Sequence, residues 1–371
     1  MVTHMVTQHT GQTSDTHDGR STPVSIAVIP GDGVGPEVIH AAVAVMTAAL
    51  SAHHTPLMVT ELPWGGERFL REGAAMPSDA AATLKKSEAV LFGAVGRPDV
   101  PDHELVWGLI IGLRQQLDLA VNVRPVIAFP GVPTKVRDTD GVDLVIVREN
   151  TEGEYVGVGG VAHAGTGHDL GIEVAVHSRR VIERAAHHAF TLAAQRSGRV
   201  ALVTKSNAMR YGYPLWDSVV REVAEQHPGV ELEVVLVDAM AARMVQDPRS
   251  LDVLLAGNLF GDILSDLAAV LAGGMGMAPS ANILPGGDVP GIYEPVHGSA
   301  PDIAGEGLAN PTACILSGVL LLEDLGRTDA ATDIRAAVAG ALRDPNNHTA
   351  DLGGSATTTS LTSAVLERLG S

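Results

Sequence analysis

Short runs of apolar, β-branched residues alternate along the chain with longer segments in which apolar residues recur at helical spacing. The short runs predict buried strands at residues 25–29, 89–95, 142–147, 200–204, 232–237 and 253–256. The longer segments predict helices at residues 36–50, 178–195, 214–226, 260–272, 312–325 and 328–342. Strands that alternate with helices in this way predict an α/β fold with mainly parallel pairing.

Glycine and proline interrupt this pattern in three stretches, residues 129–133, 157–167 and 273–290, which predict loops or boundaries. Residues 157–173 lie between two helical regions and are rich in Gly, Val and His. We expect a protruding β arm there. An exposed arm of this kind needs a partner to cover it, so the sequence predicts a homodimer.

Length and charge limit the classes of protein to consider. The 371 residues suffice for about two domains of roughly 150 residues each. With 25 basic and 43 acidic residues the formal net charge is −18, which disfavours nucleic acid and anionic membrane surfaces as partners. We expect no membrane span, because Asp262 and Asp266 interrupt the longest apolar run that we identify.

Cysteine content and the N-terminal segment suggest the compartment. The single cysteine, Cys314, excludes an intramolecular disulfide framework or a thiolate zinc site and suits a reducing, cytoplasmic compartment. Residues 1–22 lack the apolar core of a signal peptide and predict a disordered tail. The tail histidines His4, His9 and His17 have no scaffold that would make them a metal site.

Acidic residues on an otherwise apolar helix are the strongest chemical signal. Asp262 and Asp266 are four residues apart and share one helix face, where two like charges destabilise each other unless something positive compensates. Asp238 ends a strand-like run and is a third carboxylate that converges with them in this interpretation. Three carboxylates without Cys or His ligands suit Mg²⁺ or Mn²⁺. The alternative is a solvated acidic face, which fits poorly with the apolar neighbours.

Several other polar residues stand in apolar settings. Lys205 follows a predicted buried strand, where α/β active sites form, so it is either a base or a surface lysine. Three arginines also stand in apolar settings, Arg114, Arg124 and Arg148. Planar guanidinium groups pair bidentately with carboxylates, so these arginines bind either an acidic substrate or internal acids. Tyr155 is either catalytic or a packing residue.

A glycine-rich turn, residues 29–37 (IPGDGVGPE), closes the first predicted strand and opens the first predicted helix. Glycines there would let backbone N–H groups approach an anion at the helix N-terminus. The spacing is not Gly-x-Gly-x-x-Gly. A dinucleotide site and a tight strand-to-helix turn therefore both remain open.

Five motifs give a resemblance to a known family. They are residues 29–38 (IPGDGVGPEV), 122–126 (NVRPV), 148–155 (RENTEGEY), 258–266 (NLFGDILSD) and 293–311 (YEPVHGSAPDIAGEGLANP). From about Val24 to Leu342 the chain resembles the isocitrate and isopropylmalate dehydrogenase family, the metal-dependent β-decarboxylating dehydrogenases. Residues 92–103, 107–108 and 129–133 look most like the tartrate/D-malate dehydrogenase branch, whereas residues 237–240 (VDAM) look like isopropylmalate dehydrogenase.

The resemblance implies a two-domain open α/β sheet that is not a standard Rossmann fold, with the active site in the cleft between the domains. Residues 23–121 and 276–371 would form the large cofactor-binding domain. Residues 122–275 would form the small domain for dimerisation and metal binding, with the β arm near residues 157–173.

The resemblance also implies roles for individual residues. Arg114, Arg124 and Arg148 would hold the malate moiety, and Tyr155 would protonate the enolate. The metal would be bound by Asp262, Asp266 and Asp238 of the partner subunit, with Lys205 of the partner subunit as the base. The adenosine side of the cofactor would contact Tyr293, Glu294, His297, Gly298, Ser299, Ala300, Asp302, Ile303 and Asn310. Asp302 would repel a 2′-phosphate, which favours NAD⁺ over NADP⁺.

Substrate choice is less constrained. The resemblance disfavours isocitrate, because residues 109–112 (LIIG) lack the polar groups that hold its extra carboxylate. Ile110 and Ile111 either pack an isopropyl group or line the wall beside an unsubstituted malate. Arg97 departs from the expected pattern and would add charge to the pocket, which leaves a specialised 3-substituted malate open.

We therefore expect a cytoplasmic homodimer that uses NAD⁺ and Mg²⁺ or Mn²⁺ to decarboxylate a 2-hydroxy diacid of the D-malate/tartrate type. 3-Isopropylmalate is the alternative substrate. A non-catalytic regulatory subunit is disfavoured, because the catalytic and metal-binding positions all keep their residues.

Overall fold

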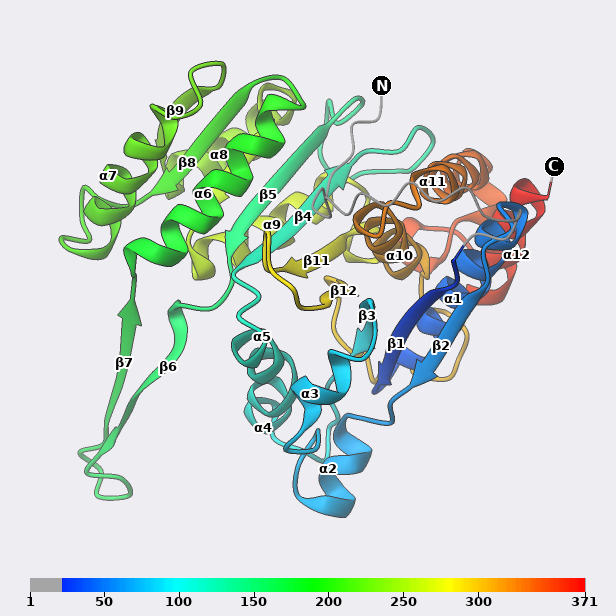
Figure 1. Ribbon diagram of the computed structural model, residues 1–371, viewed down its shortest axis with the longest axis horizontal. Coiled ribbons are helices and arrows are strands. Elements are labelled where there is room, and N and C mark those ends of the chain that lie inside the picture. The colour runs from blue at the N-terminus through cyan, green and yellow to red at the C-terminus, as the bar shows by residue number, and fades with distance from the viewer. Residues whose placement is uncertain (1–21, 371) are drawn as a thin grey trace.

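One ten-stranded sheet runs through the computed structural model, in which residues 22–370 are described (Figure 1). The strand order is β2-β1-β3-β12-β11-β4-β5-β10-β8-β9, and β6 and β7 form a separate two-stranded sheet. The strands are β1 (Val24–Gly31), β2 (Leu57–Glu61), β3 (Ala89–Ala94), β4 (Val121–Ile127), β5 (Asp143–Glu149), β6 (Gly153–Ala162), β7 (Leu170–Val176), β8 (Arg199–Thr204), β9 (Glu231–Leu236), β10 (Val253–Ala256), β11 (Pro279–Ile283) and β12 (Gly291–Pro295). The predicted α/β class is confirmed, and each of the six predicted strands is present.

Strand pairing changes direction in the middle of the sheet. The outer strands pair in parallel, whereas β12–β11, β11–β4 and β4–β5 pair antiparallel. The predicted domain boundaries at residues 121/122 and 275/276 fall within or just before these central strands. The division into domains stays a prediction, because the ten strands form one continuous sheet.

Helices cover the sheet, and all six predicted helices are present. The helices are α1 (Gly35–Ala52), α2 (Gly66–Glu72), α3 (Ala80–Leu84), α4 (Asp102–Leu105), α5 (Gly112–Gln116), α6 (Arg179–Ala194), α7 (Gly212–Ala224), α8 (Val237–Gln246), α9 (Asn258–Leu271), α10 (Thr312–Asp324), α11 (Thr328–Leu342) and α12 (Thr358–Leu369). A π-helical segment, Val106–Ile111, joins α4 to α5. Helices of this type are rare and occur often at functional sites.

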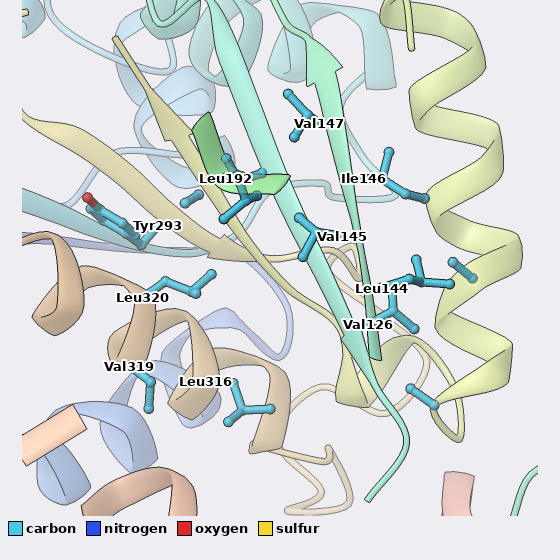
Figure 2. Packing of buried hydrophobic residues seen from close by; sticks show 14 of the residues in the cluster. Val126, Leu144, Val145, Ile146, Val147, Leu192, Tyr293, Leu316, Val319 and Leu320 are labelled. Atoms are coloured by element: carbon cyan, nitrogen blue, oxygen red, sulfur yellow. The ribbon is translucent and has the colours of Figure 1, made fainter. Parts of the chain in front are cut away.

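The larger hydrophobic core extends across the change of strand direction. Figure 2 shows part of it, where Val145 and Val147 of β5 and Leu316 and Leu320 of α10 belong to one buried cluster. Cys314 on α10 is also fully buried, and burial raises the pKa of its thiol. The two halves of the sheet therefore share apolar contacts as well as backbone hydrogen bonds.

Helix α1 is an apolar segment that the expectation about membrane spans did not consider. By length and composition alone, Gly35–Ala52 is long and apolar enough to cross a bilayer. Half of its residues are buried, however, and it packs against α10, α11 and α12. Its apolar residues are thus accounted for as part of the core.

Strands β6 and β7, in the glycine- and valine-rich segment, pair antiparallel and form a hairpin that projects from the molecule (Figure 1). Val158, Val161, Leu170, Ile172 and Val174 are all exposed on it. A single chain therefore leaves the apolar side chains of the arm uncovered. The predicted tail and its three histidines lie outside the described residues, apart from Thr22.

Candidate active site

The structure brings the predicted arginines and the two carboxylates of α9 together. Arg124 on β4 and Arg148 on β5 are buried and point toward Asp262, with Arg124 Nη1 3.3 Å from Asp262 Oδ1. Arg148 Nη1 donates to Asp262 Oδ1. Asp266, whose side chain is 53 % exposed, lies one helical turn further, 3.8 Å from Arg124. The positive group that the sequence required beside these acids is therefore supplied, in one chain, by guanidinium groups.

Hydrogen bonds fix the directions of these arginines. Arg148 Nε and Nη2 donate to Asn258 Oδ1 at 3.0 and 2.6 Å, and Arg124 Nη1 donates to Ser265 Oγ at 2.5 Å. Arg114 lies on α5, and its Nη2 donates to Glu294 Oε1 at 2.8 Å. We call Arg114, Arg124 and Arg148 the arginine cluster. Each of its members is buried, so each is held in one orientation.

Burial and the neighbouring positive charges shift the pKa values of the two acids in opposite directions. Burial raises the pKa of Asp262, but the guanidiniums of Arg148 and Arg124 outweigh it and hold the pKa below its ordinary value. The pKa of Asp266 is raised, mainly by burial, and the attraction of Arg124 offsets only part of the rise. Burial and the neighbouring Arg124 lower the pKa of Arg148 to about 9. Asp262 is thus the more acidic carboxylate of the pair.

Tyr155 on β6 faces the same place. Its hydroxyl donates to Asp262 Oδ2 at 3.1 Å, and the guanidinium carbon of Arg148 lies 5.6 Å from the centre of its ring. Burial and the negative charge of Asp262 raise the pKa of Tyr155. The phenol therefore keeps its proton at neutral pH, as a proton donor must.

Lys205 and Asp238 form a second polar group. Lys205 Nζ lies 2.7 Å from Asp238 Oδ1, and this contact lowers the pKa of Asp238. Asp238 lies in the first turn of α8, one residue beyond the strand-like run, rather than at the end of β9. Within residues 22–370 no three His, Cys, Asp or Glu side chains gather closely enough to hold a metal ion. One chain alone thus does not join Asp238 to Asp262 and Asp266.

Part of the predicted cofactor loop lines a cavity of about 430 Å³. His297, Gly298, Ala300, Ile303 and Asn310 line it as expected. Sequence reasoning missed its remaining residues, which are Val34, Met275, Gly276, Leu308, Ala309, Ala350 and Asp351. They come from four separate parts of the chain, and only their packing in the fold reveals them.

The other predicted cofactor residues lie outside this lining. Asp302 is exposed on the same loop, and the Ser299 carbonyl accepts from Val34 N–H at 2.8 Å. Glu294 is buried beside Arg114, and Tyr293 is buried with its hydroxyl donating to Asp324. The structure therefore places Tyr293 and Glu294 in the interior of the fold and away from the cavity.

The glycine-rich turn packs against this loop. Gly33 has φ +60°, and a Cβ on it would lie 1.9 Å from the Ser299 carbonyl oxygen. The structure thus supports a tight strand-to-helix turn that needs glycine for close approach. The turn also forms one side of the cavity through Val34.

The π-helical segment contacts the root of the arm. It carries Ile110 and Ile111, which are half-buried, and Trp107, whose ring covers Gly157 of β6. A Cβ on Gly157 would lie 2.9 Å from Cη2 and Cζ3 of Trp107. On the following helix, Gln115 Nε2 donates to the Tyr155 carbonyl at 3.4 Å. The segment that carries the predicted specificity residues therefore packs on the strand that carries Tyr155.

Arg97 does not add a free charge to this region. Its Nε and Nη2 donate to the two carboxylate oxygens of Asp99 at 2.8 and 2.9 Å. The aliphatic part of its side chain packs on Gly66, where a Cβ would lie 2.3 Å from Arg97 Cδ. The charge of this unexpected arginine is thus paired locally.

Gly157→Ala is expected to lower kcat about tenfold, because the new methyl group would push β6 away from Trp107 and shift Tyr155, two residues earlier. The positive φ of Gly157, +79°, adds backbone strain. Gly160→Ala on the same strand has open space around it and is the matched control. Steady-state kinetics of both variants test the effect, and equal kcat values would contradict it.

Comparison with known proteins agrees with this arrangement. A family model described as isocitrate/isopropylmalate dehydrogenase matches residues 25–368. The chain belongs to this family of decarboxylating dehydrogenases. The crystal structure of isocitrate dehydrogenase from Methylococcus capsulatus has a TM-score of 0.86 at 36% identity, and the match covers 94% of this chain and 100% of that one. The predicted family and its fold are confirmed.

Relatives named tartrate dehydrogenase/decarboxylase and relatives named 3-isopropylmalate dehydrogenase have the same sequence identity to the chain. A probable tartrate dehydrogenase/decarboxylase of Agrobacterium vitis is 45% identical over 348 residues, 93% of this chain and 97% of that protein. A 3-isopropylmalate dehydrogenase of Thermobifida fusca is 45% identical over 324 residues, 86% of this chain and 92% of that protein. The first relative supports the predicted tartrate branch, but overall similarity does not select the substrate.

Proposed function

We propose that the protein is an NAD⁺-dependent, Mg²⁺- or Mn²⁺-dependent oxidative decarboxylase of a 2-hydroxy diacid of the D-malate/tartrate type. One observation carries this proposal. The buried arginine cluster, the carboxylates of α9 and the protonated hydroxyl of Tyr155 converge at one place. Guanidiniums bind carboxylates, and a proton donor beside them suits a reaction that releases CO₂ and leaves an enolate.

Charge balance supports a dianionic substrate together with a divalent cation. The arginine cluster contributes three positive charges, and Glu294, Asp262 and Asp266 contribute three negative ones when ionised. A divalent cation would bring the sum to +2. A diacid with two ionised carboxylates would then return it to zero, which lowers the cost of burying all these charges.

The donor atoms fit the proposed cation. Asp262 and Asp266 offer carboxylate oxygens, which suit Mg²⁺ or Mn²⁺ better than softer metals. Asp266 is half-exposed and free of short contacts with Arg124, so its oxygens are accessible. Two acids are too few for a complete site, so the remaining ligands would come from Asp238 of the partner subunit, the substrate and water. When bound, the ion would supply electrophilic stabilisation of the 2-oxygen.

The residues of the chain would act in order. The arginine cluster binds and orients the two carboxylates of the diacid. Lys205 of the partner subunit would accept the proton of the 2-hydroxyl group, and NAD⁺, when bound, would supply the acceptor for the hydride that leaves C2. The bond between C3 and the β-carboxylate then breaks, CO₂ departs, and its electron pair forms the enolate. Tyr155 donates its proton to C3 and completes the product ketoacid.

The preference for NAD⁺ rests on Asp302. This carboxylate is exposed on the loop that lines the cavity of about 430 Å³. A 2′-phosphate beside it would be repelled, whereas ribose hydroxyls would donate to it. We therefore propose that the cavity takes the adenosine part of NAD⁺.

The exposed apolar surface supports a homodimer. The arm leaves Val161 69% exposed, and Ile263, next to Asp262, is 59% exposed. A second copy that covers both would bring its own chain to α9, where the third acid is missing. We propose this dimer, located in the cytoplasm, as the active form. It needs neither nucleic acid nor membrane.

3-Isopropylmalate remains the second candidate substrate. Ile110 and Ile111 are half-buried on the π-helical segment and offer an apolar wall. The similarity to a 3-isopropylmalate dehydrogenase favours the same candidate.

The proposal is tested with D-malate, tartrate, 3-isopropylmalate and isocitrate, each assayed for NADH absorbance with NAD⁺ and MnCl₂. We expect kcat/KM to be highest for D-malate or tartrate, and at least a hundredfold loss with excess chelator that Mn²⁺ restores. NADP⁺ in place of NAD⁺ is the cofactor control. Turnover that persists in chelator would refute the metal requirement, and a preference for isocitrate would refute the substrate class.

A further inference from the structure

A path of buried side chains connects two members of the arginine cluster. Asn122 on β4 and Asn282 on β11 lie opposite each other in the antiparallel pairing and are fully buried. Arg124 Nε donates to Asn122 Oδ1 at 2.6 Å, and Asn122 Nδ2 donates to Asn282 Oδ1 at 3.0 Å. Asn282 Nδ2 donates to Glu294 Oε1 at 2.8 Å. Arg114 Nη2 donates to that same oxygen, so the path runs from Arg124 to Arg114.

Every hydrogen bond on this path has a fixed direction. A guanidinium can only donate, so the oxygen of Asn122 must face Arg124 and its nitrogen must face Asn282. The oxygen of Asn282 is then the acceptor, and its nitrogen must face the Glu294 carboxylate. Turning either amide over would place two acceptors or two donors against each other. We call Arg124, Asn122, Asn282, Glu294 and Arg114 the amide path.

Additional bonds occupy the remaining capacity of Asn282. Its Oδ1 also accepts from Asn150 Nδ2 at 3.0 Å, and its Nδ2 also donates to the Ile292 carbonyl at 3.0 Å. Both polar atoms of Asn122 and of Asn282 have partners, and a buried amide whose partners are all present is held rigidly. These amides therefore fix side chains on β4, β11 and β12.

The geometry points to Asn122 and Asn282 as positioning residues for substrate binding. We infer that the amide path sets the separation and orientation of Arg114 and Arg124, so that the two guanidiniums meet the carboxylates of one diacid. This inference rests on the proposed function, because it assumes that the arginine cluster binds the substrate. It assigns neither asparagine a contact with the reacting atoms.

Asn282→Asp tests the path with almost no change in shape. The new side chain can still accept from Asn122 and Asn150, but it replaces the donor toward Glu294 with an acceptor. We expect KM for the diacid to rise about tenfold, as for the loss of a hydrogen bond to a charged group, with KM for NAD⁺ changed less than twofold. Steady-state kinetics with each substrate varied in turn measure both constants.

The pH dependence gives a readout that a merely structural role would not produce. At acid pH, protonation of the carboxyl group that Asn282→Asp introduces restores a donor toward Glu294, so the tenfold increase should shrink between pH 8.5 and pH 6. The charged groups that face this pair are Arg114 directly and Arg124 through Asn122. Wild-type protein over the same pH range is the reference.

Ser280→Ala is the matched control. Ser280 is equally buried and accepts from Asn122 Nδ2 at 2.7 Å, but it lies off the amide path. It should lower Tm while leaving KM for the diacid unchanged. Asn122→Asp, which keeps the acceptor for Arg124 and loses the donor to Asn282, provides a second test should Asn282→Asp not fold.

The outcomes separate this inference from the function on which it rests. If the wild type is active and KM for the diacid is unchanged in both Asn282→Asp and Asn122→Asp, the inference alone is overturned. It is also overturned if Ser280→Ala and Asn282→Asp change KM for the diacid, KM for NAD⁺ and Tm in the same way. A wild type that turns over none of D-malate, tartrate and 3-isopropylmalate would overturn the proposed function and the inference with it.

Discussion

Asp262→Asn is expected to lower kcat by about three orders of magnitude while the protein stays folded. Asp262 is the point where the site converges, since it accepts from Arg148 and Tyr155 and lies 3.3 Å from Arg124. Asparagine keeps the shape and one acceptor oxygen but removes the charge that would bind the divalent cation. Measurement of kcat with saturating diacid, NAD⁺ and MnCl₂ gives the effect directly.

The same variant should be less stable, in a way that depends on pH. The pKa of Asp262 is lowered in the folded protein, so its charge stabilises the fold above its unfolded pKa of about 3.9, and this contribution is lost as pH falls through the folded pKa. The side chain is 35 % exposed, so we expect only about 1 kcal/mol. The Tm difference between wild type and variant should therefore be largest near pH 7 and should shrink below about pH 4.

Asp252→Asn is the matched control for Asp262→Asn. Asp252 is buried and pairs with Arg196 at 2.7 Å. The control removes a paired carboxylate from the fold without touching the arginine cluster. It should lower Tm but change kcat less than twofold. Comparable losses of kcat in the two variants would mean that Asp262 supports the fold only.

The arginine cluster and the acids of α9 could be predicted from sequence because each interrupts an apolar element, whereas Tyr155 lies in a polar run and its role came from the family motif. Asp262 stands among leucines on a helix, and Arg148 is the last residue but one of the buried strand β5. Charges in such places need partners, so the pattern alone indicated that each has one, without showing which. The structure pairs Arg148 with Asp262, and Arg124 Nη1 lies 3.3 Å from the same carboxylate. The family motifs added roles that the pattern could not assign.

Strand β11 could not be predicted, although it is fully buried. Its residues, Pro279–Ile283, include Ser280 and Asn282, and the surrounding glycines and prolines made the stretch resemble a loop. A buried strand accepts such residues only when side chains elsewhere in the chain satisfy their hydrogen bonds. Those partners are Asn122 and Glu294, more than ten residues away. The amide path is thus invisible to any local pattern.

The placement of Tyr293 and Glu294 shows the same limit. Their motif suggested cofactor contacts, but β12 lies between β3 and β11, and this position turns both side chains into the interior. The motif identifies the loop that follows. The orientation of each strand residue depends on the neighbouring strands, which no run of contiguous residues specifies.

Gly261→Ala is expected to lower kcat/KM about a hundredfold. Helix α9 approaches β5 so closely at Gly261 that a Cβ would lie 2.7 Å from both Cβ and Cγ of Arg148. These atoms are close to the backbone, so Arg148 cannot swing away, and α9 must move instead. Asp262 is the next residue and moves with the helix. The free energy of unfolding should fall by about 1–3 kcal/mol from the overpacking, and urea denaturation measures this change.

Gly340→Ala is the control that separates the effect of steric overlap from the effect of replacing a helical glycine by alanine. Gly340 also lies inside a helix, α11, but a Cβ there would lie 3.1 Å from Cδ of Arg368, in the flexible outer part of a long side chain that can adjust. Alanine favours a helix over glycine by about 0.5–1 kcal/mol, so this variant should be slightly more stable and fully active. Because the helix preference is the same at both positions, a loss confined to Gly261→Ala measures how closely α9 must pack on Arg148 to place Asp262. Equal activity in the two variants would show that α9 tolerates displacement at this point and that the site does not depend on the close approach.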